Sequence, residues 1–162
     1  MSVKEELHEG DMQVILARYF NSSSNVIVPN VSWGLGLHEI DLLILTSSNY
    51  AWEIEIKISI SDLRADKKKH HAHYSNKIKR LYFAIPEKLQ EGALPLIPER
   101  AGLLLVAPNH YVRLIKAPII NKAARKFTDK EVQKLYELAA IRLWSLKEVV
   151  YRLQRELKGK IK

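Results

Sequence analysis

The chain has 162 residues, 47% of them hydrophobic, and a net charge of +8, so it suits one compact domain whose partner is a polyanion, either nucleic acid or an anionic membrane surface. The absence of cysteine excludes disulfides and thiolate metal sites and is typical of the reducing cytoplasm. No apolar run approaches the roughly 20 residues that a membrane span needs, and the first residues lack the apolar segment of a signal peptide, so we expect a cytoplasmic protein with no membrane partner.

The first half of the chain is predicted to form a helix followed by three strands. Apolar residues at helical spacing predict the helix over residues 3–20, and a strand follows over residues 26–33. The most regular segment is a predicted β-hairpin, in which residues 38–46 and 50–59 are joined by Ser47-Ser48-Asn49. Alternation in its second strand places Glu55 and Lys57 on one face and the apolar residues on the other.

The second half alternates helices with strands. The expected elements are a helix over 59–77, a strand over 80–86, a short helix over 87–98, strands over 101–108 and 110–118, and a long helix over 128–157. Thr128 and Glu131 match a capping box at the start of the last helix. The order predicts an α/β fold with a mixed central sheet flanked by helices. We divide the chain into a core, residues 1–127, and a C-terminal amphipathic helix, residues 128–162, packed on the same domain.

Three residues of the hairpin suit phosphodiester hydrolysis. Asp41 begins an apolar strand, while Glu55 and Lys57 lie two residues apart on the neighbouring strand and point into the same space. Two carboxylates suit a hard divalent cation, which polarises a phosphate and activates water, and a lysine neutralises charge in the transition state. The alternative interpretation is a solvated strand face that carries an ordinary ion pair.

The arrangement Asp41, then Glu55-Ile56-Lys57, resembles the PD-(D/E)XK nuclease superfamily. A longer likeness, over residues 38–126, is to the MmcB-like DNA-repair branch of this superfamily. The runs that carry it are WEIEIK with the SxxDLRADKK that follows, KRLYFAIP and LIPERAGLLLV. This resemblance implies a restriction-endonuclease-like core, with Mg²⁺ or Mn²⁺ as cofactor. It implies Asp41 and Glu55 as metal ligands, Lys57 as the catalytic lysine and the Ile56 backbone carbonyl as a further ligand.

Two acidic residues adjoin this motif. Many superfamily members add a carboxylate from the first helix, and Glu9 is the candidate here. Glu39 departs from the relatives, which carry a basic residue at its position. It lies two residues before Asp41, so it either adds an acid to the site or flanks it.

A basic segment follows the hairpin and is expected to track the phosphate backbone of DNA. The predicted DNA-binding residues are Arg64, Lys67, Lys68, Lys69, Lys77, Lys79 and Arg80. The alternative for each is an ordinary solvated lysine or arginine. His70, His71 and His73 near Asp66 allow a zinc site as a weaker alternative, because adjacent histidines diverge around a helix.

These observations favour a metal-dependent deoxyribonuclease in DNA repair, recombination or mobile-element processing. The first alternative is a catalytically silent DNA-binding or assembly module of the same fold. The second is a structural protein whose C-terminal helix mediates oligomerisation, and this helix also makes a homodimer an expectation.

Overall fold

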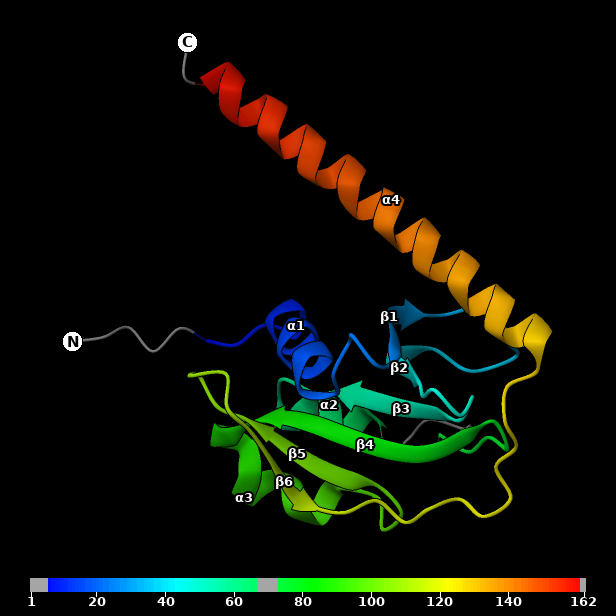
Figure 1. Ribbon diagram of the computed structural model, residues 1–162. Coiled ribbons are helices and arrows are strands. Elements are labelled where there is room, and N and C mark those ends of the chain that lie inside the picture. The colour runs from blue at the N-terminus through cyan, green and yellow to red at the C-terminus, as the bar shows by residue number, and fades with distance from the viewer. Residues whose placement is uncertain (1–5, 67–72, 161–162) are drawn as a thin grey trace.

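The computed structural model describes residues 6–66 and 73–160 and contains a six-stranded mixed sheet in the order β1-β2-β3-β4-β5-β6 (Figure 1). The strands are β1 (Val26–Val31), β2 (Ile40–Leu45), β3 (Ala51–Ile56), β4 (Ile78–Pro86), β5 (Gly102–Val106) and β6 (Val112–Lys116). Strands β3, β4 and β5 run parallel, and the other neighbours pair antiparallel. The predicted hairpin and the mixed sheet are therefore confirmed.

The helical segments lie around this sheet. They are α1 (Glu9–Tyr19), α2 (Ile60–Asp66), the short run η1 (Glu87–Leu89), α3 (Gln90–Ala93) and η2 (Leu94–Leu96), and α4 (Asp129–Lys160). α1 begins at Glu9, because His8 is its N-cap and donates its backbone N–H to Asp11. Residues 6–8 are not helical, and residues 3–5 of the predicted helix lie outside the described residues.

The helix predicted over residues 59–77 does not reach its expected end. Residues 67–72 lie outside the described residues, and residues 73–77 form no helix. His73 has a φ of +54°, a left-handed backbone conformation that a helix cannot continue through.

One face of the sheet is covered by α1. Met12, Ile15 and Leu16 of this helix pack on apolar side chains from the central strands, among them Ile54 and Ile56 of β3. Ile54 and Ile56 alternate along β3 with Glu53 and Glu55, so the apolar side chains of this strand face α1 and the two acidic side chains face the other way. Packing of α1 thus fixes the strand whose other face carries the acidic residues.

The opposite face carries two separate apolar clusters. α4 covers strands β1 and β2 through Leu135 and Leu138, while α2 and α3 cover β4 and β5. Between the clusters β3 contributes Glu53 and Glu55, both buried, which we call the acidic row. This face of the sheet is therefore apolar under α4 and under α2 and α3, whereas β3 between them carries the buried acidic row, and the candidate site begins there.

α4 is the longest helix and leaves the core part-way along its length. Thr128 caps it, with Glu131 bonded to the Thr128 backbone N–H, as the capping box predicts. Beyond Ala139 most of its side chains are exposed, and Figure 1 shows this part running past the sheet. Among the described helices, α4 included, none is long and apolar enough to cross a membrane.

Candidate active site

Three side chains from two adjacent strands meet near the end of β3. β2 and β3 pair with Leu42 opposite Ile54, and one residue further along this register Asp41 lies opposite Glu55. Lys57 follows β3 directly, and its Nζ lies 2.7 Å from Glu55 Oε2 and 3.6 Å from Asp41 Oδ2. The structure therefore brings together the acids and the lysine of the sequence motif.

Lys57 is held among carboxylates. Its buried Nζ also lies 3.4 Å from Asp66 Oδ1 at the end of α2. Burial alone would lower the pKa of Lys57, but Glu55, Asp41 and Asp66 together raise it. The ammonium group therefore stays charged at neutral pH and is fixed in position by ion pairs from three elements.

Glu55 is buried beside a second acid. Burial raises the pKa of Glu55 to about 7, the negative charge of Asp41 also raises it, and Lys57 only partly offsets both effects. A carboxyl group in this position is half protonated near neutral pH. An added cation would favour its ionised form.

Asp41 is oriented from two sides. Its Oδ2 accepts the backbone N–H of Ile56 at 2.7 Å, and its backbone carbonyl accepts a hydrogen bond from Gln13 on α1 at 3.2 Å. Gln13 also donates to Asn30 on β1 at 3.0 Å. α1 and β1 thus help to fix the strand end that carries Asp41.

An open cavity of about 410 Å³ lies over these residues. Its lining residues are Glu9, Asp41, Ile56, Lys57, Ile58, Asp62, Ala65 and Asp66. Glu9 is the first residue of α1, and partial burial together with Asp41 raises the pKa of its carboxyl group. The exposed Glu39 contributes to the same shift, so it flanks the acids of the cavity.

The donor set fits a hard divalent cation. Four of the described lining residues are acids, and Lys57 is the one base among them. Glu55 lies opposite Asp41 on the neighbouring strand and so adds a fifth carboxyl group beside the cavity. Carboxylate oxygens are the ligands that Mg²⁺ and Mn²⁺ prefer. Burial raises the pKa values of Glu9 and Glu55, and the negative charge of Asp41 raises both further, so a cation bound beside Asp41 would favour their ionised forms.

A second polar cluster adjoins the first. Sequence reasoning grouped His73 with Asp66 in its zinc alternative but did not include Glu53 or His38, and the His70 and His71 of that alternative lie outside the described residues. Glu53 Oε1 lies 2.7 Å from His38 Nε2 and 2.6 Å from His73 Nδ1, and His73 Nε2 lies 2.5 Å from Asp66 Oδ2. Burial alone would lower the pKa of His73, but Asp66 and Glu53 raise it to about 9. The signal available in the sequence was Glu53, which shares the strand face of Glu55.

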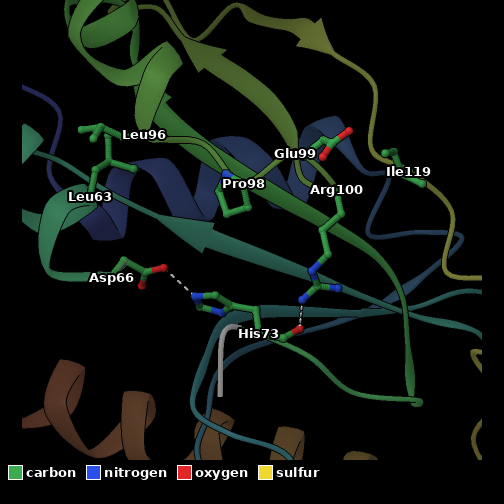
Figure 2. A pocket seen from close by; sticks show the side chains of 8 residues that line it. All are labelled: Leu63, Asp66, His73, Leu96, Pro98, Glu99, Arg100 and Ile119. Carbon is green, nitrogen blue, oxygen red and sulfur yellow. Dashed lines mark hydrogen bonds and ion pairs between the residues drawn. The ribbon is translucent and has the colours of Figure 1, made fainter. Parts of the chain in front are cut away.

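Figure 2 shows where His73 lies relative to a neighbouring pocket of about 600 Å³. The side chains of Asp66 and His73, which are hydrogen-bonded to each other, line one side of this pocket. Arg100 donates a hydrogen bond to the His73 backbone carbonyl. Leu63 and Pro98 contribute apolar wall. Arg100 thereby fixes the backbone of the residue that connects the acidic row to α2.

The predicted DNA-binding residues that the structure describes do not form one patch around the cavity. Arg64 is exposed on α2, whereas Lys67, Lys68 and Lys69 lie outside the described residues. Lys77 binds Glu131 at 2.9 Å and the Leu35 carbonyl. Its side chain thus connects the start of β4 to α4.

Lys79 and Arg80 also lie at the start of β4. They sit over the rings of Tyr50 and Trp52 at 4.6 and 4.8 Å. Arg80 pairs with Trp52, three residues before Glu55 and five before Lys57, so it lies about 10 Å along the sheet from Glu55 and about 16 Å from Lys57.

Comparison with known proteins identifies the family. A Silicibacter pomeroyi protein of unknown function, SPO1766, has the same fold, with a TM-score of 0.66 and 23% sequence identity, covering 88% of this chain and 93% of that one. No curated protein matches the sequence. Residues 9–149 match the family described as DNA repair protein MmcB-like, which confirms the resemblance read from the sequence. The chain therefore belongs to the MmcB-like DNA repair protein family.

Proposed function

We propose that this protein is a Mg²⁺- or Mn²⁺-dependent nuclease that hydrolyses phosphodiester bonds of DNA in repair, recombination or mobile-element processing. The observation that carries the proposal is the convergence of Asp41, Glu55 and Lys57, with Nζ to carboxylate distances of 2.7 and 3.6 Å, under an open acidic cavity. Family membership supports DNA as the substrate, and so does the net charge of +8.

Each residue of the site has a distinct role in this proposal. Asp41, Glu55 and the backbone carbonyl of Ile56 would hold the cation, with Glu9 as an additional carboxylate. A bound cation supplies Lewis-acid polarisation of the phosphodiester and lowers the pKa of water. Lys57 presents a fixed positive charge to the phosphate oxygens as negative charge develops on them.

DNA would reach the site over the α2 side of the cavity. Arg64 is exposed on α2, the helix that also supplies Asp62 and Asp66 to the cavity lining. Lys79 and Arg80, at the other end of the strands, would contact a phosphate more distant from the cleaved bond. In this proposal Arg64, Lys79 and Arg80 position the DNA and take no part in the chemical step.

The proposal is tested by DNA cleavage with purified protein in Mg²⁺ or Mn²⁺. Asp41→Asn and Glu55→Gln remove one proposed ligand charge each and should lower the cleavage rate at least 100-fold, an effect of about 2.7 kcal/mol or more on the activation free energy. Asp129→Asn, an exposed acid at the start of α4, is the matched control and should retain full activity.

The alternative, a catalytically silent DNA-binding module, predicts a different pattern. In that case wild type and Asp41→Asn would bind plasmid, flap and branched DNA equally without added metal. Neither protein would cleave any of these substrates. That combination of results would reject the nuclease proposal while leaving the fold and the family unchanged.

We also propose that α4 pairs with α4 of a second copy to form a homodimer. Leu143, Leu146, Val150, Leu153 and Leu157 are each at least 50% exposed and recur at alternating spacings of three and four residues. Such spacing forms one continuous apolar stripe on a helix. In a two-fold symmetric pair the same stripe of each copy would face the other, so both copies would bury these side chains at once.

A further inference from the structure

Two histidine rings and a carboxylate converge at the acidic row. His38 Nε2 and His73 Nδ1 approach the same oxygen, Glu53 Oε1, at 2.7 and 2.6 Å. The two rings meet edge to face, with centroids 5.3 Å apart and an interplanar angle of 81°. The three donors come from the segment before β2, from β3 and from the segment after α2, so that distant parts of the chain point at one position.

The second nitrogen of His73 is fixed by a carboxylate. Asp66 Oδ2 lies 2.5 Å from His73 Nε2 (Figure 2), while Nδ1 faces Glu53. Metal-binding histidines in proteins commonly donate their other ring N–H to a carboxylate, which fixes the tautomer and the ring orientation. Asp66 stands in this supporting position, and His73 Nδ1 is left to face the convergence point.

Glu53 shows that the cluster is not complete as a hydrogen-bond network. Its side chain is fully buried, and its Oε2 accepts no hydrogen bond from the described residues. A buried carboxylate oxygen without a donor is costly unless a cation or another donor satisfies it. The side chain of His38 is 10% exposed, so the cluster is open to solvent at that edge.

We propose that His38, Glu53 and His73 bind a zinc ion, separate from the proposed catalytic cation. Two imidazole nitrogens and one carboxylate oxygen are a typical zinc donor set, and water would occupy the fourth position of a tetrahedral site. Metal–ligand bonds of about 2.0–2.1 Å put tetrahedral ligand atoms about 3.4 Å apart. Each histidine nitrogen must therefore move only about 0.7 Å further from Glu53 Oε1 to share a zinc ion with it. The ion would tie the segment after α2 to the central strand of the sheet.

This site differs from the proposed nuclease centre in its chemistry. The nuclease centre offers carboxylate oxygens and a lysine, which suit a hard cation, whereas the second cluster offers imidazole, which suits zinc. The two clusters adjoin, since His73 Nδ1 lies 3.9 Å from Glu55 Oε1. Zinc binding does not depend on the nuclease proposal, and either could hold without the other.

The test is zinc content and affinity of the full-length protein, measured by elemental analysis after dialysis and by calorimetry with Zn²⁺ alone. Wild type should retain one zinc per chain. His38→Ala should weaken the affinity more than tenfold, and Asp66→Asn should weaken it 10- to 100-fold through loss of the supporting carboxylate, effects of about that size being known for such partners. His110→Asn, at an exposed histidine, is the matched control and should bind as wild type does.

Two further measurements keep the outcomes distinct. Asp41→Asn should retain zinc even if it loses DNA cleavage, which separates failure of this inference from failure of the proposed function. Wild type loaded with Co²⁺ should show the intense visible absorption of a tetrahedral site, a readout that does not depend on how well any variant folds. Absence of zinc and of this absorption in wild type, or equal zinc binding by folded His38→Ala, would overturn the inference.

Discussion

Glu55 is the residue at which stability and the proposed chemistry conflict. It is 1% exposed, it lies beside Asp41, and its pKa is raised to about 7 from an ordinary value of 4.5. The folded protein therefore binds a proton at this group more tightly than the unfolded chain does. The resulting stability is fully present below pH 4.5 and is lost as the pH rises through about 7.

Glu55→Gln should separate these two properties. The amide imitates the protonated acid at every pH, so in EDTA at pH 8 the variant should be more stable than wild type by about 1–3 kcal/mol. At pH 4.5 the difference should shrink, because Glu55 is then largely protonated in folded wild type and half protonated in the unfolded chain. Urea unfolding at the two pH values measures this, and a variant that is less stable at pH 8 would contradict the assignment.

The sequence is sufficient to place the triad but not its neighbours. Alternation along β3 assigned Glu55 and Lys57 to one face, and a tight hairpin register, which the structure has, brings Asp41 opposite Glu55. Alternation alone does not distinguish a solvated strand face from a buried one. Glu53 is buried because His73 closes over it from a segment 20 residues away, and no local spacing predicts such a contact.

At the scale of elements, the start of α4 is the most strongly fixed helix end. Glu131 bonds both Arg125 nitrogens at 2.7 Å, contacts Lys77 at 2.9 Å and accepts the Thr128 backbone N–H at 2.9 Å. Arg125 foremost, with Thr128 and Lys77, holds the pKa of Glu131 well below its usual range. Stability from this group is present above pH 4.5 and is lost as the pH falls towards the folded-state pKa.

Glu131→Gln should therefore destabilise the protein by about 1–2 kcal/mol at pH 7, since it weakens a helix cap and a bidentate ion pair. The difference from wild type should decrease below pH 4.5, where the unfolded wild-type chain takes up a proton. Urea unfolding across this range is the measurement. Glu137→Gln, further along α4 with one exposed contact to Lys134, is the control and should change stability by less than about 0.5 kcal/mol.

Elements with strong local signals were predicted well. The hairpin has an apolar run before its polar turn and an alternating run after it, and α4 has a capping box and a long apolar stripe. The helix expected over residues 59–77 was wrong at its end, because its apolar face is thin and His73 takes a left-handed conformation that its neighbours in the fold stabilise. Local propensity does not contain that information.

At the scale of the whole molecule, the exposed half of α4 is the largest departure from a compact domain. Its apolar face continues the face that packs on β1, since Leu135 and Leu138 are buried while Leu146 and Leu153 are at least 50% exposed. A contiguous exposed apolar stripe marks an interaction surface. Because a two-fold pair would bury the same stripe on both copies, a second copy is the partner that we expect.

Sedimentation equilibrium of the full chain tests this assembly. Wild type should be a dimer, and the double variant Leu146→Glu with Leu153→Glu should be a monomer, because charges in the stripe face each other across the helix pair. Tyr151→Ser, on the other side of the helix, should remain dimeric. A wild-type monomer at the highest attainable concentration would contradict the proposed dimer and leave the catalytic proposal intact.

The central claim is that Asp41, Glu55 and Lys57 form a nuclease centre, and Lys57 offers its most direct test. The measurement is single-turnover cleavage of DNA in Mn²⁺ by wild type and Lys57→Ala, with DNA affinity determined in parallel. We predict cleavage by wild type and a loss of at least 100-fold in the variant, about 2.7 kcal/mol, with affinity changed less than about threefold. Undiminished cleavage by Lys57→Ala, or no cleavage of any DNA by wild type, would contradict the account.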